Sequence, residues 1–352
     1  MRFYKFLTRS IWYNKNLNLF LIVYYLLFYV FELIYIFIVF FRKKLYEHGL
    51  LKAYKFNVPI IVVGNITVGG TGKTPLVIYI ANYLKTHGFN PGIVSRGYKS
   101  KCKTVSLVNN DSDPEIFGDE PVLLAKSTVC PVVVGKDRTL VVNFLLKNHS
   151  NINVIICDDG LQHYKLKRDL EIAVVDRVNQ FGNRHCLPLG PLREPIERLK
   201  TVDLTIINGE TGSEEDELDL ECKNRSKNNY VFKLAPETIY NLLDPNNIKT
   251  PKDFTTVHAV SGIGNNQRFF DLLRNLGIKI IKHEFPDHYS YQEKDLNFND
   301  NLPIIMTAKD AVKCIKFAKN NFWCQTVKVE IKLLEEFNNY LINFLSNFYV
   351  KQ

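Results

Sequence analysis

The chain has 352 residues, 46% of them hydrophobic and 23% charged, which is enough for about two ordinary domains with buried cores. Its formal charge of +9 is uneven, because residues 1–60 hold nine basic and two acidic side chains and the rest of the chain carries only +2. A basic excess around one apolar segment is typical of contact with anionic lipid headgroups and argues against a nucleic-acid partner. Seven widely spaced cysteines without a C-x-x-C pair indicate neither a disulfide framework nor a zinc site, so we expect a reducing, cytoplasmic setting.

A continuous apolar segment runs from Leu17 to Phe41, with Asn18 and Glu32 as its strongly polar members. It exceeds the roughly 20 residues that cross a bilayer, and the basic run at 42–44 that follows it argues against a cleaved signal peptide. Two alternatives remain open, a single span and a helix lying in the membrane interface. Glu32 would cost about 2–3 kcal/mol if it faced lipid, which favours partial insertion or a face packed against protein. The third alternative is a buried helix of a soluble core.

Beyond this segment, short apolar runs alternate with amphipathic stretches, which predicts an α/β fold with a mostly parallel sheet. The first strands are expected at 59–63, 91–95, 132–134, 154–157, 172–175 and 204–207. A helix is expected at 75–87, an acidic surface loop at 209–221 and a linker strand at 230–234. The pattern then resumes with strands at 256–260, 279–285 and 304–307 and a helix at 266–276.

This pattern predicts three parts. They are an N-terminal membrane-anchor helix with basic flanks (1–56), a P-loop NTPase-like core (57–228) and a smaller C-terminal α/β domain that begins with the linker strand (229–352).

The most informative segment is the glycine-rich turn GNITVGGTGKT at 64–74, which joins a predicted strand to a predicted helix. Such a turn directs backbone N–H groups and a helix N-terminus at phosphate oxygens. Lys73 would reach the β- and γ-phosphates, and the Thr74 hydroxyl would bind Mg²⁺. Thr67 stands where the common pattern has glycine, so the loop is a variant, and a glycine-rich turn with an exposed lysine is the alternative. The residues expected to bind nucleotide are Thr67, Val68, Gly69, Gly70, Thr71, Gly72, Lys73 and Thr74.

Asp158 and Asp159 follow the apolar run at 154–157, the context of the second metal-binding motif of P-loop enzymes. One of them would hold Mg²⁺, and an ordinary acidic turn at a strand end is the alternative. No N-K-x-D motif follows a predicted strand, which favours ATP over GTP.

Seven motifs occur in an order that resembles the tetraacyldisaccharide 4'-kinase family, over residues 58–310. They are Gly64-Asn65 with the loop at 69–75, SRGY at 95–98, GDEP at 118–121, DDGLQH at 158–163, LPLGPLRE at 187–194, FPDH at 285–288 and TAKD at 307–310. The chain departs from the family pattern at Lys99, where glycine is common, and at Tyr289, where a second histidine is common.

The resemblance implies transfer of the ATP γ-phosphoryl group to the 4'-hydroxyl of a tetraacylated glucosamine disaccharide 1-phosphate. The implied place is the cytoplasmic face of the inner membrane, and we expect a monomer. Asp119 would be the catalytic base, oriented by His288, with Lys73 stabilising the transferring charge. The implied Mg²⁺ neighbours are Thr74, Glu120 and Asp158. The implied substrate contacts are Asn65, Ser95, Arg96, Asp159, Gln162, His163 and Arg193.

Several of these residues have ordinary structural roles as alternatives. Asp119 lies in a turn before a helix, where acids are favoured in any case. His288 could cap a loop, His163 could be a structural histidine, and Arg193 could form a surface ion pair worth under about 1 kcal/mol.

A different class of protein also fits part of the sequence. Membrane-associated switch ATPases of the partitioning type use GGTGKT-like loops, but they often carry a second lysine early in the loop and a C-terminal membrane helix. This chain has no lysine between Gly64 and Gly72, and its apolar segment is N-terminal.

Overall fold

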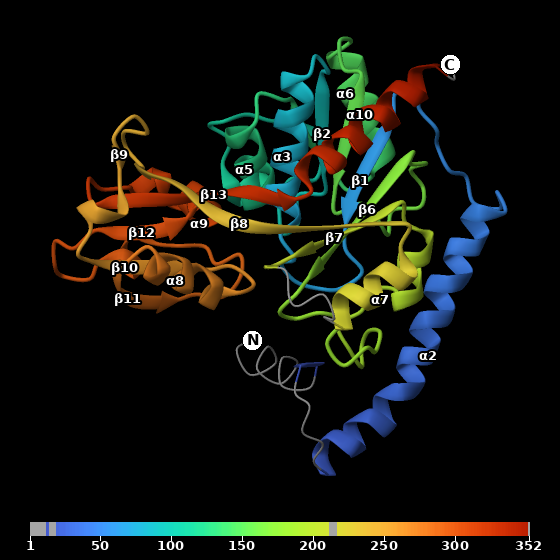
Figure 1. The fold of residues 1–352 in the computed structure, drawn as a ribbon, viewed down its shortest axis with the longest axis horizontal. Helices are drawn as coiled ribbons and strands as arrows, with labels where there is room; N and C mark the ends of the chain where they lie inside the picture. Colours follow the sequence, from blue (N-terminus) through green and yellow to red (C-terminus); the bar gives the residue numbers. More distant parts are fainter. Residues whose placement is uncertain (1–11, 14–18, 211–216, 351–352) are drawn as a thin grey trace. The chain divides into compact units, whose positions relative to one another are not determined.

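The computed structural model describes residues 12–13, 19–210 and 217–350. The chain divides into two compact units, whose elements are labelled in Figure 1. Unit 1 comprises Met1–Lys73, Cys157–Lys233 and Ile331–Gln352, and unit 2 comprises Thr74–Ile156 and Leu234–Glu330. The two units therefore alternate along the chain, whereas the domains predicted at 57–228 and 229–352 are consecutive, and those domain boundaries stay a prediction.

Unit 1 is built on a parallel sheet whose strands are buried. The strand order is β8 (Asn228–Asn241), β7 (Leu204–Asn208), β6 (Leu170–Asp176), β1 (Ile60–Gly64) and then the end of β5 (Val154–Asp158). Every residue of β1, β6 and β7 is buried, which is typical of a parallel sheet covered on both faces. The helices of this unit whose bounds lie in the described residues are α2 (Leu19–Glu47), η1 (Ile196–Thr201), α7 (Glu217–Arg225) and α10 (Leu334–Val350).

The carboxyl ends of these strands meet at one edge of the sheet. β1 and β6 pair in parallel, as do β6 and β7, with Gly64 opposite Ala173 and Asp176 opposite Asn208. Ligands of open α/β sheets bind at this edge. The fold thus places the end of β1, where the glycine-rich turn begins, at the same edge of the sheet as the residue that ends β7, with β6 between the two strands.

Unit 2 contains two groups of strands. The first group has β2 (Pro91–Ser95) parallel to β4 (Val132–Val134), which pairs antiparallel with β3 (Ser106–Val108), and it includes the start of β5. Its helices are α3 (Lys73–Thr86), α4 (Pro114–Phe117), α5 (Asp119–Ser127) and α6 (Arg138–Asn148).

The second group of unit 2 is a small α/β sandwich. Its strand order is β11 (Lys279–Glu284), β10 (Thr256–Ser261), β12 (Ile304–Thr307), β13 (Phe322–Lys332) and the end of β8, which carries the antiparallel β9 (Ile248–Lys249). Two cores lie against this sheet, one including Phe269, Phe270 and Leu273 of α8 (Asn266–Asn275) and one including Ala311 and Cys314 of α9 (Ala308–Cys314). The short helices are η2 (Pro251–Asp253), η3 (Glu293–Leu296) and η4 (Ile315–Phe317).

The predicted elements are largely confirmed. The strands expected at 91–95, 132–134 and 304–307 have the same bounds in the structure, and the helix expected at 75–87 begins two residues earlier, at Lys73. Two expectations are wrong in extent. The stretch 209–221, expected as a loop, includes the first half of α7, and its residues 211–216 lie outside the described part of the chain. The linker strand expected at 230–234 is the 14-residue β8, whose alternating and partly polar residues conceal its length.

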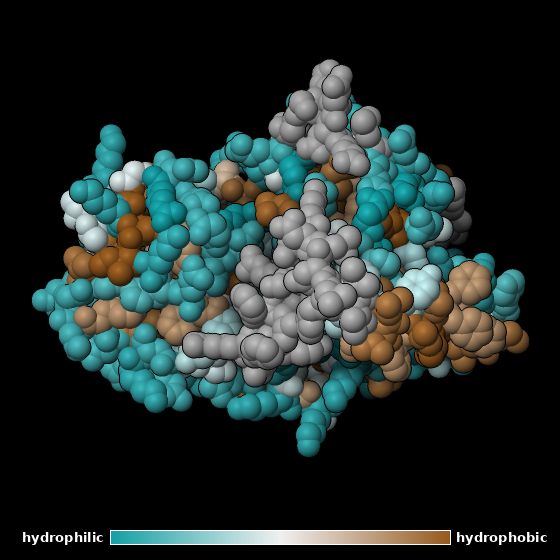
Figure 2. Space-filling model, turned by 90° about the horizontal axis from the view of Figure 1, so that it is seen from below, coloured by the Kyte–Doolittle hydropathy of each residue, from teal (hydrophilic) through white to brown (hydrophobic). Residues whose placement is uncertain are grey.

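Helix α2 presents a long apolar face to solvent. It is long and apolar enough to cross a membrane, although the start of the apolar segment, 17–18, lies outside the described residues. Figure 2 shows the apolar surface, in brown, at the right of the view. The side chains at least half exposed are Leu26, Leu27, Tyr29, Val30, Phe31, Ile34, Phe37, Ile38, Phe40 and Phe41. The alternative of a buried core helix is therefore wrong, whereas Glu32 is only 4% exposed and packs against protein, as expected.

Candidate active site

The glycine-rich loop closes against the end of β7. Gly69 and Gly72 have φ values of +108° and +89°, which only glycine adopts without strain. The Asn208 side chain donates a hydrogen bond from Nδ2 to the Thr71 carbonyl at 3.0 Å, and a Cβ atom on Gly72 would lie 2.3 Å from the same nitrogen. Asn208 was not predicted as a site residue, although its position directly after the apolar run 204–207 was a usable signal.

The segment that contains Pro191 and Arg193 also holds the glycine-rich loop in place. The Val68 N–H donates to the Pro191 carbonyl at 2.8 Å, and the Arg193 N–H donates to the Ile66 carbonyl at 2.7 Å. The LPLGPLRE motif is thereby joined to the glycine-rich turn through backbone hydrogen bonds. Gly69 and Gly70 stay exposed, so their backbone is open to a ligand.

Two cations share one carboxylate beside this loop. The Lys73 ammonium lies 3.6 Å from Asp159 Oδ1, and Arg193 Nη1 lies 2.9 and 3.0 Å from the two Asp159 oxygens. Gln162 accepts from Arg193 Nη1 at 3.3 Å and donates from Nε2 to the Asn65 carbonyl at 3.0 Å. The structure thus brings together five of the predicted site residues. Positive groups clustered around a strand-end loop are suited to hold the oxygens of a phosphate group.

Glu194 fixes the orientation of Gln162. Its Oε2 accepts from Gln162 Nε2 at 2.8 Å, and its other oxygen accepts from the Tyr164 hydroxyl. Glu194 is 2% exposed, and Arg198 Nε lies 3.7 Å from it, so its charge is balanced by a buried arginine. No role for Glu194 was predicted, because its partners are up to 32 residues away in the sequence.

The predicted magnesium ligands have suitable chemistry. Asp158 ends β5 and is buried, and Thr74 lies half-buried in the first turn of α3. Carboxylate and hydroxyl oxygens are the hard donors that Mg²⁺ prefers, and this ion usually takes one or two protein ligands together with phosphates and waters. Within the described ranges no group of three or more His, Cys, Asp or Glu side chains could hold a metal ion.

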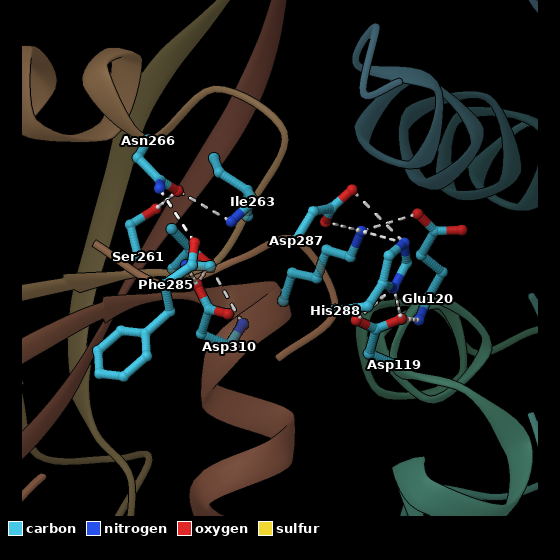
Figure 3. A network of polar contacts seen from close by, with 12 residues as sticks. Asp119, Glu120, Ser261, Ile263, Asn266, Phe285, Asp287, His288 and Asp310 are labelled. Carbon is cyan, nitrogen blue, oxygen red and sulfur yellow. Dashed lines mark hydrogen bonds and ion pairs between the residues drawn. The ribbon is translucent and has the colours of Figure 1, made fainter. Parts of the chain in front are cut away.

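In unit 2, an acidic and basic cluster surrounds the start of α5 (Figure 3). His288 Nδ1 lies 2.9 Å from both carboxylate oxygens of Asp119, the first residue of that helix. Lys309 Nζ lies 3.0 Å from Glu120 Oε1, 3.2 Å from Asp287 Oδ1 and 3.4 Å from His288 Nε2. His288 thus faces Asp119 with Nδ1, and its Nε2 faces Lys309 and also lies 3.6 Å from Asp287 Oδ2.

The charges of this cluster control the ionisation of Asp119. Burial alone would raise the pKa of Asp119, but the hydrogen bond from His288 and the charges of Lys309 and Lys313 outweigh burial and lower this pKa to about 2. Burial would likewise lower the pKa of Lys309, whereas the carboxylates of Glu120, Asp287 and Asp119 raise it overall. At neutral pH the cluster therefore contains an ionised Asp119 and a charged Lys309.

Comparison with known proteins gives this geometry a context. A family model described as tetraacyldisaccharide-1-P 4'-kinase matches residues 24–346. The chain belongs to this family. It is 45% identical over 307 residues to the tetraacyldisaccharide 4'-kinase of Nitrosococcus oceani, covering 86% of each chain, and 44% identical over 329 residues to that of Coxiella burnetii, covering 92% and 91%.

A solved relative agrees with the fold. The chain is similar to a crystal structure of LpxK from Aquifex aeolicus in complex with ATP, with a TM-score of 0.74 and 32% identity over 90% of this chain and 98% of that one. The α/β fold with a mostly parallel sheet and an apolar N-terminal helix is thus confirmed.

The TAKD motif of this tetraacyldisaccharide 4'-kinase family member has a clear structural role. Asp310 is fully buried and accepts hydrogen bonds from the Gly262 N–H, the Thr307 hydroxyl and Lys313 at 2.7–2.9 Å. These contacts fix the first turn of α9 and with it Lys309. The sequence identifies this motif, but the contact of its Lys309 with the GDEP and FPDH motifs depends on the fold.

The remaining predicted residues lie in two places. Ser95 ends β2 and is buried, Arg96 is exposed, and the Tyr98 ring packs edge-on against His288 with centroids 5.2 Å apart. This turn therefore belongs to the Asp119 cluster of unit 2. In unit 1, the His163 carbonyl accepts from Arg168 Nη2 at 2.7 Å, a contact that serves the fold.

Proposed function

We propose that this member of the tetraacyldisaccharide 4'-kinase family transfers the γ-phosphoryl group of ATP to the 4'-hydroxyl of a tetraacyl glucosamine disaccharide 1-phosphate, a step of lipid A biosynthesis. The observation that carries this proposal is the cluster of Lys73, Asp159 and Arg193 at the glycine-rich loop, in a chain of this family. The Aquifex aeolicus relative was solved in complex with ATP, which supports ATP as the nucleotide of this chain.

The loop at 67–74 holds the nucleotide phosphates in this proposal. Backbone N–H groups of the exposed glycines and the N-terminus of α3 donate to phosphate oxygens, and Lys73 neutralises their charge. Thr74 and Asp158 would hold Mg²⁺, which supplies charge stabilisation when bound, with Glu120 as the further candidate. The Arg193 guanidinium gives up part of its contact with Asp159 and interacts instead with the negative charge of the transferring phosphoryl group.

Asp119 accepts the proton of the sugar hydroxyl, with His288 as the residue that orients it. A carboxylate with a pKa of about 2 is a weak base at neutral pH. Proton transfer to it therefore comes late, when bond formation to phosphorus has made the hydroxyl acidic, as expected for a loose transition state. Asp119 then contributes to the transfer rate more by positioning the hydroxyl than by accepting its proton.

We also propose two groups of residues that contact the substrate. Asn65, Asp159, Gln162, His163 and Arg193 form one candidate group. Ser95 and Arg96, next to the Asp119 cluster, form the other.

Helix α2 binds the membrane with one face. Its buried face carries Glu32 and its opposite face is apolar, so we propose a helix that lies in the interface of the inner membrane on the cytoplasmic side. An interfacial helix explains both the protected carboxylate and the exposed aromatic side chains better than a single span does. A monomer that sits at the surface in this way can reach a lipid headgroup.

Labelled phosphate transfer tests the proposal. Wild type, Lys73→Ala and Asp119→Ala are incubated with γ-labelled ATP, Mg²⁺ and detergent-dispersed tetraacyl disaccharide 1-phosphate, with Lys126→Ala and Asp111→Ala as exposed controls. We expect labelled lipid from wild type and both controls, and at least about a hundredfold less from the two site variants. ATP hydrolysis without labelled lipid would instead indicate the switch ATPase.

A further inference from the structure

Helix α2 contacts a loop of unit 1, residues 183–193, through a carboxylate placed in the middle of its apolar sequence. Glu32 Oε1 accepts from the Cys186 N–H at 2.5 Å, and Glu32 Oε2 lies 2.8 Å from His185 Nδ1. These partners lie more than 150 residues away in the sequence. They account for the burial of Glu32, since a buried carboxylate requires hydrogen-bond donors.

Tyrosines on the same face of α2 hold further points of this loop. The Tyr35 hydroxyl donates to the Arg193 carbonyl at 2.9 Å, and the Tyr24 hydroxyl donates to the Pro188 carbonyl at 3.2 Å. Tyr25 accepts from Asn183 at 2.9 Å. The contacts thus extend along three turns of the helix and along the whole loop.

The 183–193 loop is internally braced, so it responds as one body. The Leu187 N–H donates to the Leu192 carbonyl at 2.9 Å, and the Leu192 N–H donates to the His185 carbonyl at 3.1 Å. The Gly190 N–H donates to the Cys186 carbonyl at 2.8 Å, and a Cβ atom on Gly190 would lie 2.2 Å from the His185 carbonyl oxygen. A restraint on Cys186 is therefore transmitted to the end of the loop.

The end of the loop lies at the phosphate site. Arg193 donates its backbone N–H to Ile66, within the turn that precedes the glycine-rich loop, and its guanidinium holds Asp159, which lies 3.6 Å from Lys73. A small displacement of the Arg193 backbone would move the guanidinium relative to Lys73. Misplacement of a charged group by about 1 Å can cost a hundredfold in rate.

We propose that Glu32 and Tyr35 are positioning residues for phosphoryl transfer, which hold the 183–193 loop so that Arg193 meets the transferring phosphate. This inference rests on the proposed function. It gives α2 a second role, because the helix that provides the membrane face is also the support of the phosphate site. Glu32 and Tyr35 act through Arg193 and contact neither substrate.

The test is a double-mutant cycle between Tyr35→Phe and Arg193→Ala in the full-length protein. Tyr35→Phe removes one hydroxyl, and we expect kcat to fall about fivefold with the KM for ATP nearly unchanged. In the Arg193→Ala background the same change has less than about a twofold effect, because the residue through which Tyr35 acts is gone. Tyr349→Phe, at a 39% exposed tyrosine of α10, is the matched control and keeps wild-type kcat.

A second readout does not depend on activity. Hydrogen exchange of the peptide covering 183–193 should become at least about tenfold faster in Glu32→Ala, while the β1 peptide (Ile60–Gly64) keeps its rate. Unchanged exchange in Glu32→Ala, or equal effects of Tyr35→Phe in both backgrounds, overturns the inference. If the 183–193 peptide exchanges faster in Glu32→Ala than in wild type but wild type transfers no phosphate, the proposed function is refuted. The support of the loop by α2 is then still established.

Discussion

The contact of Asp119 with His288 and the nearby lysines makes the stability of the protein depend on pH in the acid range. The folded state holds the pKa of Asp119 at about 2, against an ordinary value of 3.8. Each pKa unit corresponds to about 1.4 kcal/mol, so ionised Asp119 adds about 2 kcal/mol to the free energy of unfolding. Because the folded pKa is depressed, this contribution is complete above about pH 4 and is lost as the pH falls through 2.

The substitution Asp119→Asn keeps the size of the side chain and removes its charge. We expect the variant to be less stable than wild type at pH 5, and the difference to narrow by about 1.5 kcal/mol between pH 5 and pH 2.5. Urea unfolding followed by circular dichroism at several pH values measures it. Asp111→Asn, an exposed aspartate, should show a constant and small difference.

A difference in unfolding free energy between wild type and Asp119→Asn that stays constant over this pH range would contradict this expectation. The Asp119 carboxylate would then have an ordinary pKa in the folded state. Its contacts with His288 and the nearby lysines would contribute no differential stabilisation.

Three other perturbations have defined outcomes. Lys309→Met leaves the surrounding carboxylates without their nearest cation and should lower kcat at least about a hundredfold in the transfer assay, with Lys309→Arg partly active. Gly72→Ala should weaken ATP binding at least about tenfold by isothermal titration, whereas Gly88→Ala, also at positive φ but in open space, should leave ATP affinity unchanged at a cost of about 1 kcal/mol in stability. Phe37→Glu, at a side chain 65% exposed, should reduce cosedimentation with anionic vesicles severalfold, and Val129→Glu, at one 80% exposed, should not.

The elements predicted best from the sequence are the buried strands. The runs at 91–95, 132–134 and 304–307 are short, apolar and completely buried, so composition alone defines their bounds. β13 and α10 were not predicted, because their exposed residues interrupt the apolar pattern and the strand pairs with distant parts of the chain.

The candidate site likewise has a part that the local sequence predicts and a part that depends on contacts between distant segments. The loop around Lys73 was predictable, since its glycines and lysine are contiguous and each has a local physical reason. The support from Asn208, the contact of Lys309 with the FPDH motif and the partners of Glu32 were not, because each joins segments separated by 21 to 154 residues. The apolar segment illustrates this limit: its composition predicted a membrane helix with a protected Glu32, but which residues protect it depends on the fold.

The position of the new phosphate on the lipid is the property that defines a 4'-kinase. Wild-type protein is incubated with ATP, Mg²⁺ and tetraacyl disaccharide 1-phosphate, and the product is examined by phosphorus NMR and fragment mass. We expect one added monophosphate ester at the 4'-hydroxyl of the distal glucosamine, formed in equal amount with ADP and absent with Lys73→Ala. ADP released without a phosphorylated lipid, or a phosphate placed on another hydroxyl, would contradict it.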